Sequence, residues 1–156
     1  MAGLYFEQFS VGQTFVHEIR RTVTDMDNIL FSALTYNPAA VHIDHEYAKS
    51  TEFGKPLVNS CFTLSLVTGQ SVTDLSQNVL ANLGWDEVRM PYPVFAGDTI
   101  YSRSEVLEKR ESKSRSNVGI VSVKTTGMNQ KGDVVIEFKR TFMVYKRGHV
   151  PNAHRP

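Results

Sequence analysis

The residues best suited to acid–base chemistry gather in one segment, 37–60, of the 156-residue chain. It contains Asn37, His42 five residues later, and the pair Asn59–Ser60 just before the apolar run Cys61–Val67. An imidazole titrates near neutral pH and can both take and return a proton. The apolar run predicts a buried helix, whose N-terminus offers unpaired N–H groups and a partial positive charge. The segment therefore predicts an active site built from a polar loop and a helix start.

Composition and charge are those of an ordinary globular domain, with 41% apolar and 21% charged residues. A net charge of +1 gives no electrostatic reason to bind nucleic acid or an acidic membrane. No apolar stretch approaches the roughly 20 residues of a membrane span, and the N-terminus lacks a secretory signal pattern. The single cysteine, Cys61, allows no intrachain disulfide, so we expect a cytoplasmic location, with a mitochondrial one also open.

Hydrophobic periodicity predicts the elements that must position this site. A strand is expected over 13–23, followed by a helix that starts at Thr24, where Thr24 and Asp27 form an approximate capping box. The apolar residues at helical spacing predict an inward face made of Met26, Ile29, Leu30, Ala33 and Leu34.

The rest of the chain predicts one more short helix, one long helix and a set of long strands. The short helix is expected over 44–51, and the long helix over about 60–75 with most of its circumference buried. Strands are expected over 79–90, 99–112, 116–128 and 134–146. Helices and strands segregated in this way indicate an α+β domain, here a single domain over 1–147. The polar tail 148–156 is expected to be disordered.

Three motifs in this order resemble the MaoC-like hydratases of the hot-dog fold, in which an antiparallel sheet wraps around one long central helix. They are NPAAVHIDHEYAKSTEFGKPLVNS at 37–60, the helix CFTLSLVTG at 61–69, and PVFAGDT at 93–99. The resemblance covers about residues 5–146. The stretches TEFGKPLVNSCFTLSLV at 51–67 and ANLGWDEVRMPYPVFAGDT at 81–99 are similar to a subgroup acting on branched C5 dicarboxylic acyl-CoAs, the itaconyl-CoA and mesaconyl-CoA hydratases.

The resemblance implies a role for each matching residue. His42 matches the catalytic histidine, and Asn37 stands where related enoyl-CoA hydratases have a catalytic aspartate. Because an amide cannot act as a general base, Asn37 is expected to hold the water while His42 moves the proton. The backbone N–H groups of Ser60 and Cys61 are expected to bind the thioester oxygen, and Thr68 matches a hydroxyl residue near the catalytic pair.

Each of these residues also has a purely structural interpretation. His42 could pack against Asp44 or Asp25, and the Asn-Pro step is a common helix stop. Asn59 or Ser60 could simply cap the long helix. Asp44 is either a supporting carboxylate near the site or, at the start of the short helix, an N-cap.

Basic residues supply candidates for the charged parts of an acyl-CoA. Arg20, Arg21 and Arg89 are candidates for a second substrate carboxylate, with ordinary exposure on a strand as the alternative. The turn containing Lys113 and Arg115, with Lys109 and Arg110, is a candidate for the coenzyme A phosphates or a solvated hairpin tip. The remaining histidines show no metal-like spacing, so we expect no metal and no cofactor beyond coenzyme A as part of the substrate.

The resulting hypothesis is an acyl-CoA hydratase or dehydratase acting on an α,β-unsaturated thioester. Two alternatives stay open: a hot-dog thioesterase, identified by release of free coenzyme A, and a non-catalytic acyl-CoA-binding protein. Hot-dog domains generally pair sheet edge to sheet edge, so a homodimer or a higher homo-oligomer is expected.

Overall fold

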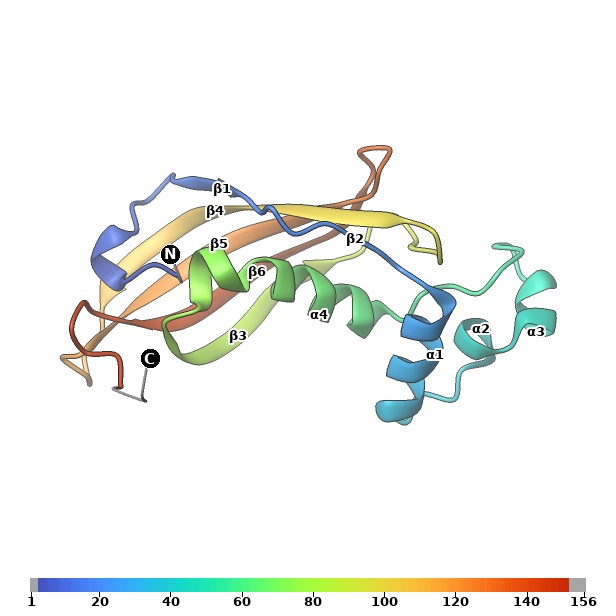
Figure 1. Cartoon of the computed structure of the whole chain (residues 1–156), viewed down its shortest axis with the longest axis horizontal. Coiled ribbons are helices and arrows are strands. Elements are labelled where there is room, and N and C mark those ends of the chain that lie inside the picture. The colour runs from blue at the N-terminus through green and yellow to red at the C-terminus, as the bar shows by residue number, and fades with distance from the viewer. Residues whose placement is uncertain (1–2, 152–156) are drawn as a thin grey trace, which may run out of the picture.

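The computed structural model describes residues 3–151, in which one antiparallel sheet curves around a long helix (Figure 1). The strand order is β1-β4-β5-β6-β3, and β2 pairs with the other end of β4. The strands are β1 Thr14–Val16, β2 Arg21–Thr22, β3 Val79–Arg89, β4 Thr99–Glu111, β5 Val118–Met128 and β6 Val134–Tyr145. This arrangement confirms the predicted α+β hot-dog fold, and the four long strands begin and end close to their predicted limits.

The central helix α4, Ser60–Gln70, lies against the inner face of this sheet. Side chains alternate along the strands, so that Phe138 and Phe142 of β6 point to the core while Lys139 and Thr141 point away. The helix packs tightly against the sheet at Gly127 of β5. A methyl group there would lie 2.8 Å from Val67 and from Ile136, so the close packing requires a glycine.

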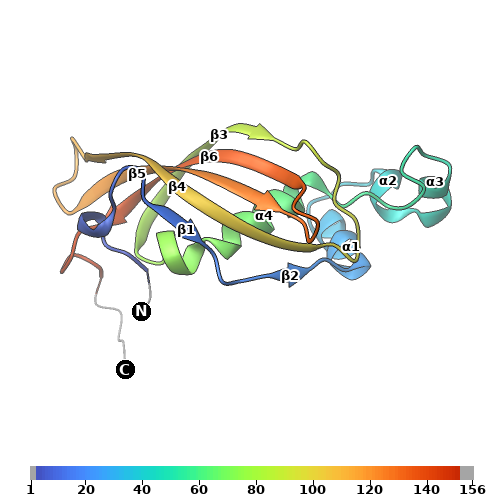
Figure 2. The same cartoon turned by 90° about the horizontal axis from the view of Figure 1, so that it is seen from above.

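Three short helices gather at the end of the sheet toward which the N-terminus of α4 points (Figures 1 and 2). They are α1 Asp25–Leu34, α2 Ala40–Ile43 and α3 His45–Lys49. Thr24 caps α1, and its side chain accepts from the Asp27 N–H while the Asp27 carboxylate accepts from the Thr24 N–H. The predicted capping box is confirmed.

The inward face predicted for α1 is wrong. Met26 is 67% exposed and Leu34 71% exposed, whereas Asn28 and Ser32, one turn apart on the opposite face, are buried. Polar residues can take the buried face because each finds hydrogen-bond partners there. The apolar face of α1 is consequently open in the single chain.

The long helix is also shorter and less buried than predicted. It ends at Gln70, because the Ser71 hydroxyl donates back to the Thr68 carbonyl at 2.7 Å and the chain continues in a short π-helical turn, Val72–Ser76. Cys61, Ser65 and Gly69 follow one another at intervals of four residues, and all three are exposed. One face of α4 is therefore lined by small residues and open.

The predicted strand 13–23 is interrupted at His17, which is buried between β1 and β2. Its Nδ1 lies 2.6 Å from the Asp74 carboxylate and its Nε2 lies 2.9 Å from the Ser104 hydroxyl. These two bonds tie the π-helical turn to β4. His17 therefore has a structural position inside the core.

The predicted disordered tail begins with an ordered turn. The His149 N–H donates to the Lys146 carbonyl at 3.0 Å, and the chain is described as far as residue 151. Residues 152–156, the rest of that tail, lie outside the described residues.

Candidate active site

His42 lies in α2, half-buried, with its ring held by a backbone carbonyl. Its Nδ1 is 2.7 Å from the Leu57 carbonyl oxygen, which can only accept a hydrogen bond. Nδ1 must therefore carry the proton, so the tautomer of the neutral ring is assigned from its hydrogen-bond partner, the Leu57 carbonyl. Within residues 3–151 the other nitrogen, Nε2, has no hydrogen-bond partner, so its lone pair is unoccupied there.

Leu57 precedes the start of α4 by three residues, so this bond joins His42 to the helix start. Asn59 is the N-cap of α4, and its Oδ1 accepts from the Cys61 N–H at 3.0 Å. The Cys61 N–H, expected to bind the thioester, is thus already bonded. Among the residues that the structure describes, the Ser60 N–H donates to no acceptor, and Ser60 is exposed. Ser60 offers the available N–H at the positive end of the helix.

A buried side-chain amide, which the sequence patterns did not reveal, connects the segment of His42 to the start of α4. Asn28 of α1 donates through Nδ2 to the His42 carbonyl at 2.9 Å and to the Leu57 carbonyl at 3.1 Å. Its Oδ1 accepts from the Asn59 N–H at 2.8 Å. Ser32, one turn later, accepts from the Asn59 side-chain amide at 3.1 Å. The only sequence signal was a pair of polar residues four apart, which an apolar-pattern analysis assigns to the surface.

Asn37 forms the predicted turn after α1. Its side-chain oxygen accepts from the Ala39 N–H at 3.1 Å, and its own N–H donates to the Ser32 carbonyl at 2.9 Å. The preceding Tyr36 has a φ of 54°, an unusual left-handed conformation for a bulky residue. Ser32 thus contacts both Asn37, through its backbone carbonyl, and Asn59, through its hydroxyl.

Asp44 is the N-cap of α3, where its Oδ1 accepts from the N–H groups of Glu46 and Tyr47 at 3.0 and 2.9 Å. This confirms the N-cap interpretation. Asp25, the other carboxylate considered for His42, lies 4.0 Å from His45 instead.

A hollow of about 240 Å³ lies beside the helix start. Its lining is mostly apolar and includes Leu57, Val58, Met90 and Val94, with hydroxyl groups from Ser60 and Thr63. His42 and Asn37 do not line this hollow, but Ser60 does, and so does Leu57, whose carbonyl holds the His42 ring. The arrangement can combine a base, an oxygen-binding N–H and an apolar binding surface.

Comparison with known proteins identifies the family. A family model described as mesaconyl-CoA hydratase matches residues 1–153. The chain belongs to the mesaconyl-CoA hydratase family. It is 36% identical over 99% of its length to a mesaconyl-CoA hydratase of Cereibacter sphaeroides, and 36% identical over 99% to a beta-methylmalyl-CoA dehydratase of Chloroflexus aurantiacus. It spans 45% and 43% of those two relatives, less than half of each.

Solved structures of other proteins have the same fold as this mesaconyl-CoA hydratase family chain. A monoamine oxidase regulatory protein from Archaeoglobus fulgidus has 32% identity and a TM-score of 0.81, with 94% of this chain and 97% of that chain covered. A MaoC-like dehydratase from Rhodospirillum rubrum has 26% identity and a TM-score of 0.80, with coverage of 93% and 99%. A Mycobacterium tuberculosis protein with a double hot-dog fold has a TM-score of 0.84 and 24% identity, and this chain covers 46% of it.

Of the other predicted residues of this mesaconyl-CoA hydratase family chain, Thr68, Lys113 and Arg115 lie away from the start of α4, whereas Arg89 directly precedes Met90, which lines the hollow beside Ser60. The Thr68 hydroxyl lies two turns along α4 from Ser60, about 12 Å, and accepts from the Trp85 ring N–H. Arg89 is exposed at the end of β3. Lys113 and Arg115 lie in the turn after β4, whose 13 residues extend about 40 Å from the end of the sheet that carries α1.

Arg21 lies near the first turn of α4. Its guanidinium lies 6.0 Å from the centre of the Phe62 ring and forms an ion pair with Asp27. Burial alone would raise the pKa of Asp27, but hydrogen bonds from Thr24 and Arg21 and the charge of Arg21 hold that pKa below its ordinary value. Arg20 lies over the Tyr101 ring instead.

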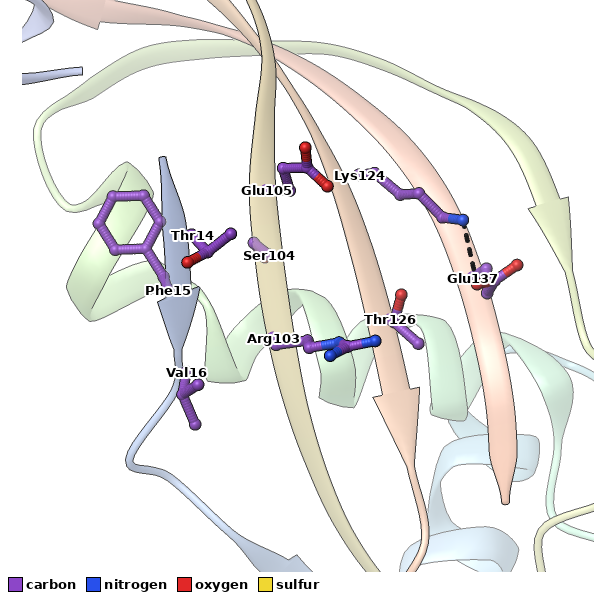
Figure 3. A pocket seen from close by; sticks show the side chains of 9 residues that line it. All are labelled: Thr14, Phe15, Val16, Arg103, Ser104, Glu105, Lys124, Thr126 and Glu137. Carbon is purple, nitrogen blue, oxygen red and sulfur yellow. Dashed lines mark ion pairs between the residues drawn. The ribbon is translucent and has the colours of Figure 1, made fainter. Parts of the chain in front are cut away.

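A larger hollow, about 330 Å³, lies on the outer face of the sheet, with α4 behind it (Figure 3). Arg103, Glu105, Lys124 and Glu137 give it both signs of charge, and Lys124 pairs with Glu137 at 3.1 Å. It contains none of the predicted site residues. Between residues 3 and 151 no group of histidine, cysteine and carboxylate side chains is arranged to hold a metal, and no helix is long and apolar enough to cross a membrane.

Proposed function

We propose that this chain adds water reversibly to the double bond of an α,β-unsaturated acyl-CoA, and that the acyl group is a branched C5 dicarboxylic one such as mesaconyl. Family membership and the names of the two relatives at 36% identity support the substrate class. The observation that carries the proposal is the 2.7 Å bond from His42 Nδ1 to the carbonyl of Leu57, three residues before α4, with Nε2 left unbonded among the described residues.

In the hydration direction, His42 Nε2 takes a proton from a water molecule as the water oxygen bonds to the β-carbon. The electrons of the carbon–carbon double bond move toward the thioester oxygen. The Ser60 N–H and the positive end of α4 stabilise the resulting enolate. The imidazolium then gives the proton to the α-carbon, so that one water molecule is added and His42 is restored. Asn37 orients the water through its side-chain amide.

The acyl chain and the second carboxylate of the substrate are also placed near the start of α4. We place the acyl chain in the apolar hollow beside Ser60, and the second carboxylate within reach of Arg21 near Phe62. Arg89, on the edge strand, is a weaker candidate because it lies at the end of β3. These placements make Arg21 the residue to test for preference of a dicarboxylic over a monocarboxylic substrate.

We also propose a homodimer in which β3 of one chain lies along β3 of the other, acting in the cytoplasm. The edge strand β3 exposes Leu83, Trp85 and Val88, and an unpaired edge of this kind favours pairing with another chain. The double hot-dog fold of the Mycobacterium tuberculosis protein supports such a pairing. The single unpaired cysteine, Cys61, supports a reducing compartment.

The experiment that tests the activity measures two signals in the same reaction. Loss of the enoyl thioester absorbance and release of free thiol are followed with mesaconyl-CoA, itaconyl-CoA and crotonyl-CoA. We expect absorbance loss without thiol release, fastest with mesaconyl-CoA. His42→Gln, whose amide can still donate to the Leu57 carbonyl, is expected to lower kcat by about 100-fold or more because the proton carrier is gone.

Three results would contradict the proposal. Thiol release would indicate a thioesterase. Tight acyl-CoA binding without turnover would indicate a binding protein. Full hydratase activity in His42→Gln would remove His42 from the mechanism.

A further inference from the structure

We propose that Asn28 is a positioning residue that sets the base and the oxygen-binding helix start in fixed relation to each other. This inference rests on the proposed hydratase function. Asn28 is 2% exposed, lies in α1, and belongs to neither of the segments that carry His42 and Ser60. It would touch neither the substrate nor the reacting atoms.

The three hydrogen bonds of the Asn28 side chain all end on the two segments that carry the proposed catalytic groups. One goes to the carbonyl of His42 itself at 2.9 Å, and a second goes to the Leu57 carbonyl at 3.1 Å. Because the Leu57 carbonyl also accepts from His42 Nδ1, Asn28 fixes both the backbone of the histidine and the group that sets its tautomer. In the third bond, Asn28 Oδ1 accepts from the N–H of Asn59, the residue before Ser60, at 2.8 Å.

Only a carboxamide side chain can form all three of these hydrogen bonds. Two carbonyl oxygens require two N–H donors, and one backbone N–H requires an acceptor, which a carboxamide provides on one planar group. An aspartate of the same shape would keep the acceptor and lose both donors. Ser32 adds a second link by accepting from the Asn59 side chain at 3.1 Å. The buried polar face of α1 thus faces the site, which explains why the apolar residues of this helix point outward.

The chain offers a matched control at Asn129, which is also 2% exposed. It lies in the turn between β5 and β6, where its Nδ2 donates to the Asp133 carboxylate at 3.0 Å and its Oδ1 accepts from the Lys131 N–H at 2.9 Å. Asn129→Asp therefore also removes a buried amide donor from an oxygen acceptor, with no contact to His42, Leu57 or Asn59.

The experiment compares Asn28→Asp with Asn129→Asp by unfolding temperature, by kcat and KM, and by ¹⁵N NMR of the His42 ring. Both variants are expected to lose stability. Only Asn28→Asp is expected to lower kcat, by about 10- to 100-fold, with KM changed less than about threefold, because a shift of the base by even 1 Å misaligns the proton transfer. Its His42 ring is expected to lose the single-tautomer pattern in which Nδ1 carries the proton, which Asn129→Asp retains.

Asn28→Ala, which removes the amide without adding a charge, is the second variant if Asn28→Asp does not fold, and the same loss of kcat and tautomer is expected. A variant at Asn28 that unfolds earlier but keeps both the wild-type kcat and the Nδ1–H tautomer would overturn the inference, since Asn28 would then be structural only. If the wild-type chain hydrates none of the enoyl thioesters, the proposed function fails, and the ring tautomer alone decides whether Asn28 positions His42.

Discussion

His42 takes its orientation from the Leu57 carbonyl, and its own backbone carbonyl accepts from the Asn28 amide. No carboxylate of the described chain is bonded to the ring, since Asp44 caps α3 and Asp25 lies near His45. With Asn37 in place of an aspartate, His42 is the one residue proposed for this site whose side chain is an acid–base group. The proposed mechanism therefore uses a single residue for both proton transfers.

Replacing Ser60 with proline removes the backbone N–H proposed to bind the enolate while leaving the helix intact. Proline is well tolerated at the first position of a helix, and Asn59 before it has a ψ of 126°, which suits a following proline. We expect kcat to fall by about 100-fold or more in Ser60→Pro. Ser60→Ala keeps the N–H and is expected to retain nearly full activity. Equal kcat in both variants would assign enolate stabilisation to another group.

Asp27 gives a pH-dependent contribution to stability. Its pKa lies below the ordinary value in the folded chain, so the ionised form stabilises the fold at neutral pH, and this contribution is lost as the pH falls through the folded pKa. We expect Asp27→Asn to lower the free energy of unfolding by about 1 kcal/mol at pH 7. The difference from wild type should shrink in urea unfolding at about pH 3. A difference independent of pH would contradict this account.

At the scale of elements, α1 shows what the sequence can and cannot specify. Its start follows from local chemistry, because Thr24 and Asp27 satisfy each other's backbone groups. Its buried face does not follow from local chemistry, because Asn28 and Ser32 are stabilised by partners 14 to 31 residues away in the chain. The apolar periodicity was real, but it marked a surface left open in the single chain.

The long strands and the helix start were predictable for a similar reason. Alternating burial and turn residues give the strand limits locally, and Asn59 provides a local cap. The end of α4 depends instead on a side chain, since Ser71 bonds back to Thr68 and the Gln70 amide reaches the Ile100 carbonyl at 2.8 Å. Of the proposed site, the sequence predicted His42, Asn37 and Ser60, and it missed Asn28, which joins the segment of His42 to the start of α4.

The spacing between α4 and the sheet depends on Gly127. In Gly127→Ala the new methyl group would press on Val67 of α4 and on Ile136 of β6, so we expect the free energy of unfolding to fall by about 1–3 kcal/mol. The matched control is Gly84→Ala on β3, where no atom lies within 4 Å of the added carbon. Chemical unfolding of both variants measures the difference, and equal stability would show that the helix can move aside.

At the scale of the whole molecule, the open surfaces of three elements need an explanation. The edge strand β3, the small-residue face of α4 and the apolar face of α1 are all exposed in the single chain. The relatives at 36% identity are more than twice as long as the stretch they share with this chain. A second hot-dog unit, in the same chain or in another copy, would cover such surfaces.

Leu83→Arg tests the proposed pairing along β3. Leu83 is 49% exposed, and a charge there would be buried without a partner in the dimer. We expect the dimer dissociation constant to rise by about 30-fold or more, measured by sedimentation or light scattering across a concentration series. Val16→Arg, on the opposite edge strand β1, is the control and is expected to leave the dimer intact. Dissociation of the control but not of Leu83→Arg would place the interface at β1.

The position of the only cysteine makes the site measurable without an assay for turnover. Cys61 is exposed in the first turn of α4, one residue after Ser60. A thiol-reactive dye therefore marks one defined position in each chain. Bound acyl-CoA is expected to shield that position, so the labelling rate in a titration reports occupancy directly. The dye bound to Cys61 is also expected to block turnover, so that modification of this thiol would inactivate the enzyme.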